Sequence, residues 1–136
     1  MSKDSSLLPN DIRQLCREGS FAGPTSGCAV GYVQANMVSL PAADAAEFAE
    51  YCKLNPKPRP VVEMLPPGNP EPLNSAPGAD VRTDLPRYRV FRDGKPIAEP
   101  TDVRDLWRDD LVTFFAGMLV HRRRSSCRCG AAAAPY

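Results

Sequence analysis

Histidine is nearly absent from this sequence: the single one, His121, lies within the last 16 of 136 residues. The first 120 residues therefore cannot form a serine–histidine–aspartate site, a cysteine–histidine site or a histidine-ligated metal site. Cys127 and Cys129, close to His121, are too few well-spaced ligands to indicate zinc. We expect no metal site and no organic cofactor.

Several other signals are missing. No GxGxxG follows a strand-like run and no GxxxxGK[ST] occurs, so the usual loops that bind nucleotide phosphates are not indicated. The N-terminal residues lack the apolar core of a signal peptide, and the longest apolar run, 111–120, is too short to span a bilayer. The five cysteines do not form a disulfide framework in such a context. We expect a cytoplasmic protein with no membrane partner.

A strong charge of one sign is lacking as well, because the formal net charge is +1. The last 16 residues carry four arginines and no acid, so the preceding 120 residues carry a formal charge of −3. A mildly acidic body argues against a nucleic-acid-binding surface.

What is present is an ordinary globular composition, 43% hydrophobic and 24% charged, at a length that allows one domain. Proline is abundant: nine of the 15 prolines lie between Pro56 and Pro86, so the middle of the chain is expected to be irregular. Strand and helix patterns alternate without a strict βαβ repeat, which predicts a mixed α+β fold with about three helices.

The predicted elements follow from caps, periodicity and turn residues. They are a helix over 9–18, a glycine-rich loop over 19–31, a strand over 32–40, a helix over 42–54, a short strand over 61–65, a loop over 69–80, a hairpin of 87–91 with 95–99, and a last helix over 101–115. After Gly117 the arginine cluster and alanine run show no apolar periodicity, which predicts a disordered tail over 118–136.

Arginines and carboxylates are concentrated in residues 80–90, DVRTDLPRYRV. The planar guanidinium suits a bidentate grip on a substrate carboxylate, and a buried aspartate can exchange a proton without a histidine. The alternative is a structural network of ion pairs beside the hairpin.

Amides offer a second set of candidates. Gln34 and Asn36 project from the same side of the predicted strand, where they either bind a polar ligand or satisfy the backbone of the adjacent glycine-rich loop. Lys57, held between prolines, suits a ligand contact, although an exposed loop lysine is the commoner case. Asp109 belongs to a charged group around Trp107 that also suits a solvated helix face.

Two long blocks together resemble a known family. Residues 21–60 are similar to its run F-x-G-P-T-x-G-x-A-x-GY-x-QAN-x-x-x-LP with the following helix and NPKP. Residues 80–114 are similar to its R-x-D-x-P-x-YRV run and W-x-x-D-x-V-x-F segment. The chain thus resembles the N-terminal half of a bacterial hydro-lyase of the D-glutamate cyclase family.

The resemblance implies an enzyme, a carbon–oxygen lyase that forms 5-oxo-D-proline and water from D-glutamate. Nine residues fall on its motif positions: the proposed catalytic residues Arg82, Asp84 and Asp109, and the proposed substrate-binding residues Gln34, Asn36, Asn55, Lys57, Arg87 and Tyr88. In this hypothesis Arg82 or Arg87 holds the α-carboxylate and Asp84 or Asp109 acts as acid and base. Gln34 and Asn36 steady the oxyanion. The expected partner is a small acidic metabolite, and a homo-oligomer is left open.

Two departures from the family pattern shape the domain prediction. Arg59 replaces an expected cysteine, and residues 118–136 replace a family segment, so they read as a frameshifted tail after a partial domain over 1–117. Two alternatives to the enzyme remain: a non-catalytic module that binds acidic metabolites, and an inactive truncated fragment.

Overall fold

The computed structural model describes residues 6–25, 27–57 and 60–117, and the backbone of 128–134. The elements in chain order are α1 (Pro9–Arg17), β1 (Tyr32–Pro41), α2 (Ala42–Leu54), β2 (Val61–Met64), β3 (Val90–Arg92), β4 (Lys95–Ala98), the 3-10 helix η1 (Arg104–Leu106), β5 (Leu111–Gly117) and β6 (Arg128–Ala134). The predicted α+β class is confirmed, with two α-helices and one short 3-10 helix among the described residues.

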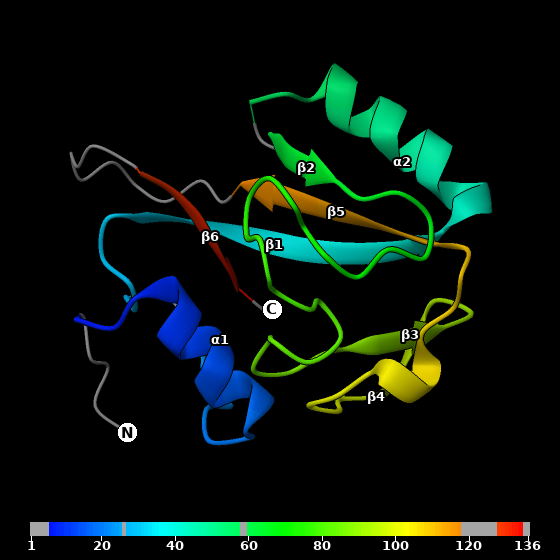
Figure 1. The fold of residues 1–136 in the computed structure, drawn as a ribbon. Helices are drawn as coiled ribbons and strands as arrows, with labels where there is room; N and C mark the ends of the chain where they lie inside the picture. Colours follow the sequence, from blue (N-terminus) through cyan, green and yellow to red (C-terminus); the bar gives the residue numbers. More distant parts are fainter. Residues whose placement is uncertain (1–5, 26, 58–59, 118–127, 135–136) are drawn as a thin grey trace.

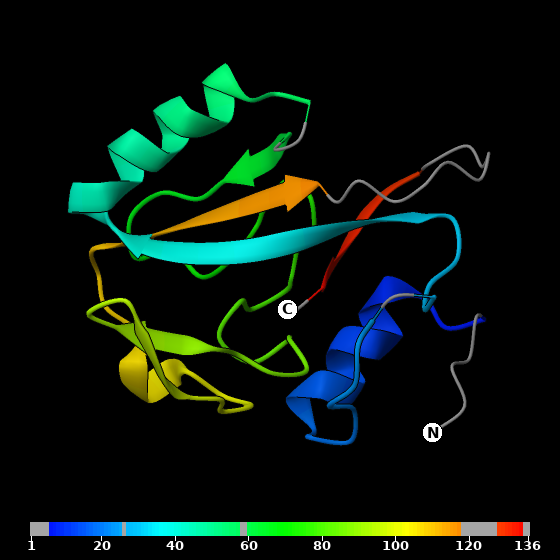
Figure 2. The same cartoon turned by 180° about the vertical axis from the view of Figure 1, so that it is seen from behind.

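Four strands form the main sheet in the order β2-β5-β1-β6, and β3 pairs with β4 in a separate hairpin. β5 runs antiparallel to both β1 and β2, whereas β6 runs parallel to β1. Figures 1 and 2 show α2 on one side of this sheet, with α1 and the hairpin on the other.

The helix α2 covers the sheet through an apolar stripe. Ala45 packs with Val112 and Phe114 of β5, and Phe48 meets the Phe114 ring edge-on with 4.9 Å between ring centroids. The helix predicted over 42–54 is confirmed, and its apolar side faces the sheet.

The opposite face of the sheet is covered by the proline-rich chain between β2 and β3. Ala35, Leu65, Val81 and Phe115 form one buried cluster there. The Glu63 carboxylate on β2 accepts hydrogen bonds from the backbone and side chain of Asn74 (3.2 and 3.3 Å) and from the backbone of Ser75 (2.8 Å), and also from the Ser75 hydroxyl. These hydrogen bonds hold the irregular loop around Asn74 and Ser75 against β2.

The helix α1 confirms its prediction closely. The Asp11 side chain accepts a hydrogen bond from the Leu8 backbone N–H (2.9 Å), which satisfies a group at the helix start. Ile12 and Cys16 pack with Cys28 and Ala29 of the segment that follows. Burial raises the pKa of the Cys16 thiol to about 12, with a smaller contribution from the Asp84 carboxylate, so this cysteine stays an uncharged core residue at neutral pH.

The hairpin forms at the predicted turn. Asp93 and Gly94 both have positive φ, 51° and 74°, as a type I′ turn requires, although its strands are shorter than predicted.

The predicted last helix over 101–115 is wrong. Only Arg104–Leu106 are helical, and Leu111–Gly117 form β5. β5 lies between β2 and β1 with Val112–Ala116 buried. A strand covered on both faces is apolar at every position and so loses the alternation that identifies a strand in sequence.

Part of the segment 118–136, which the sequence predicts to be disordered, forms a strand. Residues 128–134 form β6, which pairs with β1 through Tyr32, Gln34, Ala35 and Asn36. Strand pairing uses backbone groups alone, so an alanine run without an apolar face can still add to a free sheet edge. Residues 118–127 and 135–136 lie outside the described part, and the domain boundary near 117 stays a prediction. Within the described part, no helix is long and apolar enough to cross a membrane.

Candidate functional site

Residues 80–88 form a compact turn beside α1. The backbone N–H of Asp80 donates to Asp84 Oδ2 (2.9 Å), and the backbone N–H of Asp84 donates to the Asp80 carbonyl (2.9 Å). The Tyr88 hydroxyl donates to the Val81 carbonyl (2.7 Å) and closes the turn from its other end. These bonds give the arginine- and aspartate-rich segment one defined shape.

Asp84 is the buried centre of this turn, with 5% of its surface exposed. Arg17, at the end of α1, donates to both carboxylate oxygens at 2.8 and 2.6 Å, and the Thr83 hydroxyl donates at 2.8 Å. With the Asp80 N–H, four donors occupy this carboxylate. Asp84 therefore has little acceptor capacity left for a substrate, and its bonds tie α1 to the turn.

Asp80 and Arg82 form a second pair. Arg82 Nε and Nη2 approach the Asp80 carboxylate at 2.9 and 2.8 Å. Burial alone would raise the pKa of Asp80, but hydrogen bonds from the Arg82 side chain and backbone lower it overall. Arg82 and Asp84 form ion pairs with Asp80 and Arg17, as the alternative of an ion-pair network expects, and their proposed catalytic roles stay a prediction.

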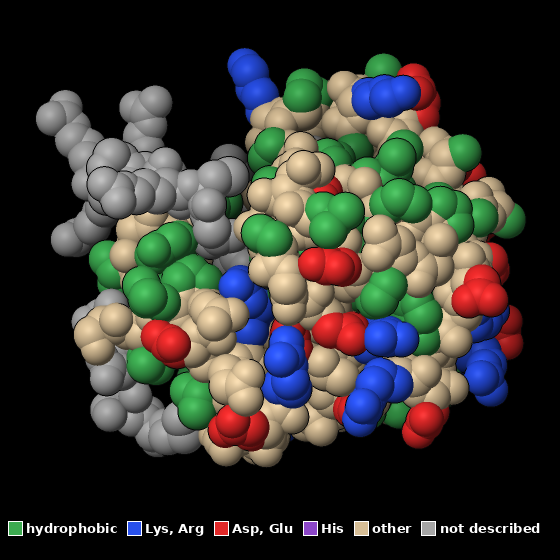
Figure 3. Space-filling model, viewed as in Figure 1, with side chains coloured by type: hydrophobic (Ala, Val, Ile, Leu, Met, Phe, Trp, Pro, Cys, Tyr) green, Lys and Arg blue, Asp and Glu red, His purple; other side chains and the backbone are tan. Residues whose placement is uncertain are grey.

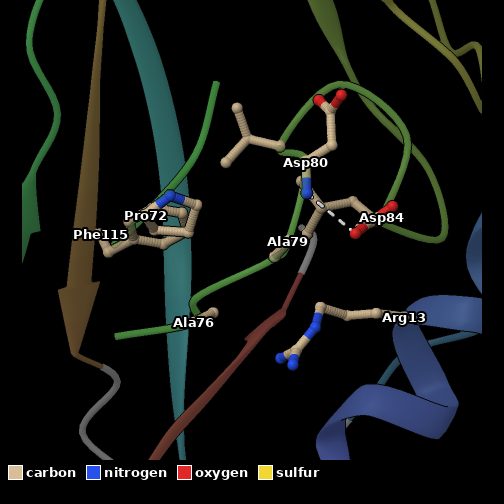
Figure 4. A pocket seen from close by; sticks show the side chains of 9 residues that line it. Arg13, Pro72, Ala76, Ala79, Asp80, Asp84 and Phe115 are labelled. Atoms are coloured by element: carbon tan, nitrogen blue, oxygen red, sulfur yellow. Dashed lines mark hydrogen bonds between the residues drawn. The ribbon is translucent and has the colours of Figure 1, made fainter. Parts of the chain in front are cut away.

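A small cavity lies against this network. It has a volume of about 20 Å³ and is lined by Arg13, Asp80 and Asp84 together with apolar side chains from the loop and β5. Figure 4 shows the Arg13 side chain reaching from α1 toward it, opposite Asp80 and Asp84. A cavity of this size holds roughly one water molecule, so it cannot accept a metabolite.

A larger cleft opens on the other side of the same turn. It has a volume of about 210 Å³ and is lined by Ala22, Gly23, Pro24, Arg87, Tyr88, Arg89 and Glu99, a set that we call the arginine cleft. The Glu99 carboxylate bridges the two arginines: Oε1 lies 2.8 Å from Arg89 Nη2, and Oε2 lies 3.8 Å from Arg87 Nη1. Figure 3 shows such acidic and basic side chains gathered over the lower part of one face.

Tyr88 forms a wall of the arginine cleft, but its hydroxyl faces the protein. Burial raises the pKa of this phenol far above its ordinary value, and the hydroxyl already donates to Val81. Tyr88 is therefore suited to ring contacts with a ligand and unsuited to proton transfer at neutral pH.

Gln34 and Asn36 project from the same side of β1. They share the face of β1 with Leu40, which packs against α2, whereas Ala35 and Met37 belong to the opposite cluster. The Gln34 amide donates to the carbonyls of Thr25 (2.8 Å) and Cys28 (3.3 Å), so it satisfies the backbone of the glycine-containing loop, as one of the two predicted alternatives stated.

Asn36 differs from its neighbour. Its Oδ1 is buried and has no hydrogen-bond partner within the described ranges, and the same holds for Thr25 Oγ1. A buried carbonyl without a partner is uncommon in folded proteins. Asn36 therefore keeps an unused acceptor oxygen, whereas Gln34 uses its amide donor to bind the loop.

Asn55 is the residue that caps the C-terminal end of α2, and Lys57 follows two positions later. The Asn55 side chain donates to the Tyr51 carbonyl (2.9 Å) and so completes the helix end, while Lys57 is exposed. Asp109 is exposed as well and makes no ion pair with any described residue; its backbone contacts Gly68.

The nine predicted residues therefore do not share one pocket. The structure brings Arg82, Asp84, Arg87 and Tyr88 together in the turn beside α1, links Gln34 to the loop at Thr25 and Cys28, and places Asn55 at the end of α2. Arg17 and Glu99 were missed as site residues, because each reaches its partner through the fold and no local motif marks either one. Within the described ranges, no group of three or more histidine, cysteine, aspartate or glutamate residues could hold a metal ion.

No family model matches the chain, but curated proteins do. It is 50% identical over 111 residues to a protein of Thermoanaerobacter sp. (strain X514) named "Putative hydro-lyase", which covers 82% of this chain and 42% of that protein. Proteins with the same name from Gluconacetobacter diazotrophicus and Bordetella petrii are 52% identical over 109 residues and 54% identical over 101 residues, covering 80% and 74% of this chain.

The matched segment makes up 39% and 38% of those two proteins, so the chain spans about two fifths of the length of these relatives. Along most of its own length it is therefore similar to bacterial proteins named hydro-lyase. The printed names state no substrate.

Proposed function

We propose that this chain is part of a carbon–oxygen lyase that releases water, and that it forms 5-oxo-D-proline from D-glutamate. The observation that supports this most directly is the arginine cleft, where two guanidinium groups face a space large enough for a small acidic metabolite. About 50% identity to proteins named hydro-lyase supports the reaction class. The proposal includes a cytoplasmic location and requires no cofactor.

The reaction is a ring closure. The neutral α-amine attacks the γ-carboxyl carbon, a carbon–nitrogen bond forms, and one carbon–oxygen bond breaks. A base takes a proton from the attacking nitrogen, and an acid gives a proton to the departing hydroxide, which leaves as water. A carboxylic acid and a carboxylate are sufficient for both transfers.

The residue roles follow from what each side chain is already bound to. Arg87 holds the α-carboxylate, because its contact with Glu99 is long and its other donors have no ion-pair partner in the described part of the chain. Arg82 and Asp84 keep residues 80–88 in shape through Asp80 and Arg17. Asp109 is the proposed acid or base from its motif position; it is exposed and does not itself line the arginine cleft.

Gln34 contacts the loop that lines the arginine cleft, because its amide donates to the carbonyl of Thr25, the residue after Pro24. The proposal therefore keeps Gln34 and Asn36 as candidates for steadying the oxyanion. Asn55 and Lys57 do not line the cleft, and the proposal assigns them no contact with a substrate held by Arg87.

The direct test is product formation. Incubation of the purified chain, and separately of the Bordetella petrii relative, with D-glutamate should yield 5-oxo-D-proline, detected by chiral chromatography. We expect Arg87→Ala to lower kcat/KM by about tenfold or more, which is the loss typical of a charged substrate contact. Asp109→Asn should lower kcat with a smaller change in KM.

Two controls sharpen this test. Arg92→Ala removes an exposed arginine of the hairpin that lines neither cavity, and it should leave turnover unchanged. Absence of 5-oxoproline with both proteins, or full activity in Arg87→Ala, would overturn the proposal.

A second candidate, a non-catalytic module for acidic metabolites, is favoured by one observation. Asp84, the buried carboxylate nearest in sequence to the arginine cleft, is fully occupied by donors. Saturable D-glutamate binding without turnover in either protein would favour this candidate.

A further inference from the structure

We propose that Glu99 sets the ligand preference of the arginine cleft, favouring molecules that carry an ammonium group beside a carboxylate and disfavouring plain dicarboxylates. The inference rests on the proposed function in one respect, since it concerns the same cleft. It adds two residues, Arg89 and Glu99, to which the proposed mechanism gives no role.

The first support is the unequal grip of Glu99 on its two arginines. Arg89 Nε donates to Oε1 at 2.8 Å and Arg89 Nη2 forms an ion pair with the same oxygen at 2.8 Å, whereas Arg87 Nη1 is 3.8 Å from Oε2. The longer distance exceeds that of a hydrogen bond. Arg89 therefore holds Glu99 in place, while the Arg87 guanidinium keeps its donors available to a ligand.

The second support is the charge of the cleft. Two arginines and one glutamate line it, so it carries one net positive charge that attracts a single carboxylate. A dicarboxylate brings a second negative group close to Glu99 and is repelled. A ligand with an ammonium group instead places that group against Glu99, which favours it over the plain anion.

The third support is how the backbone presents these side chains. Val90 pairs with Ala98 in the hairpin, and the Tyr88 N–H donates to the Pro100 carbonyl at 2.8 Å. Arg89 and Glu99 lie between these two links, so they are neighbours on adjacent extended segments and their pairing is built into the hairpin.

The fourth support is accessibility. The side chains of Arg87, Arg89 and Glu99 are 53%, 51% and 43% exposed. Exposed ion pairs contribute little free energy, so a ligand can replace the contact between Glu99 and Arg87 without a large loss. The other lining residues, Ala22, Gly23, Pro24 and Tyr88, carry no charge that competes for the ligand.

The test compares two probes with the same carbon skeleton, D-glutamate and glutarate, by titration calorimetry on the purified 136-residue protein. The wild-type chain should bind D-glutamate more tightly than glutarate. Glu99→Gln should lower the ratio of the two affinities by about fivefold or more, weakening D-glutamate and strengthening glutarate. Arg87→Ala should weaken both probes.

Glu47→Gln, on the exposed surface of α2, is the matched control and should leave the ratio unchanged. Circular dichroism checks that each variant is folded, and Glu99→Asp keeps the charge and should keep the wild-type preference if the Gln variant is unstable. An unchanged ratio in Glu99→Gln, a wild-type preference for glutarate, or no binding of either probe would overturn the inference.

This outcome is separable from that of the proposed function. Selective binding that depends on Glu99, without 5-oxoproline formation, would overturn the lyase proposal alone. Turnover of D-glutamate that is indifferent to Glu99→Gln in both kcat and KM would overturn this inference alone.

Discussion

At the scale of single residues, hydrogen bonds of buried polar side chains hold the turn over residues 80–88 in its conformation. Tyr88 is buried, and its hydroxyl donates to the Val81 carbonyl at 2.7 Å. Removing the hydroxyl leaves that carbonyl without its partner while the ring still fills its place.

We expect Tyr88→Phe to lower the free energy of unfolding by about 1–2 kcal/mol, measured by urea denaturation. Tyr51→Phe is the matched control: this exposed residue of α2 should tolerate the change with little effect. Equal stability of the two variants would show that the bond to Val81 does not hold the turn.

The residue scale also shows why the site was only partly predictable. Arg82, Asp84 and Arg87 stand out because they are close together in sequence. Arg17 pairs with Asp84 across 67 residues, and Glu99 reaches Arg89 across the hairpin. Motif positions identify residues of the right chemistry, but only the fold decides whether a guanidinium faces a ligand or an internal carboxylate.

At the scale of elements, Gly68 joins the loop after β2 to the start of β5. Its N–H donates to the Leu111 carbonyl (2.8 Å), and its own carbonyl accepts from Trp107 Nε1 (3.1 Å). It has a φ of +76°, and a Cβ added there would lie 2.9 Å from the Asp109 carbonyl oxygen.

Gly68→Ala should therefore be more destabilising than Gly78→Ala, which serves as its control. Gly78 has a similar φ of +79°, but no atom within 4 Å of an added Cβ. Both variants carry the backbone strain of roughly 1–2 kcal/mol, and Gly68→Ala adds a steric conflict of about 1 kcal/mol or more. Thermal unfolding of the two variants measures the difference, and equal midpoints would contradict it.

Elements were predictable where the pattern is local. The apolar spacing of α1, the alanine stripe of α2 and the Asp93-Gly94 turn each depend on neighbours within a few residues, and all three are confirmed. The last element was not, because Val112–Ala116 are buried on both faces and show no alternation. Nothing in that run indicates that β1, more than 70 residues earlier, is its partner.

At the scale of the whole molecule, stability should fall in acid. Burial alone would raise the pKa of Glu63, but hydrogen bonds from Ser75 and Asn74 lower it below its ordinary value of 4.5, and the pKa of Asp80 is also lowered. A carboxyl whose pKa is lower in the folded state stabilises the fold above its unfolded-state pKa.

This contribution is fully present at neutral pH and is lost as the pH falls through the folded-state value. The unfolding midpoint should therefore decrease between about pH 5 and about pH 3. Glu63→Gln should lower the midpoint at neutral pH and flatten its dependence on pH over that range, with Glu47→Gln as the control. An identical pH profile in Glu63→Gln would show that the loop does not depend on this carboxylate.

The pairing of β1 with β5 has a consequence for how the chain is made. Ser39 lies opposite Thr113, and their hydroxyls share a hydrogen bond of 2.8 Å across 74 positions. During translation, β1 leaves the ribosome well before its partner strand exists, at roughly 5–20 residues each second. For several seconds the backbone N–H and C=O groups of β1 must form hydrogen bonds with water or with a chaperone. The centre of the sheet cannot assemble until residue 117 has emerged.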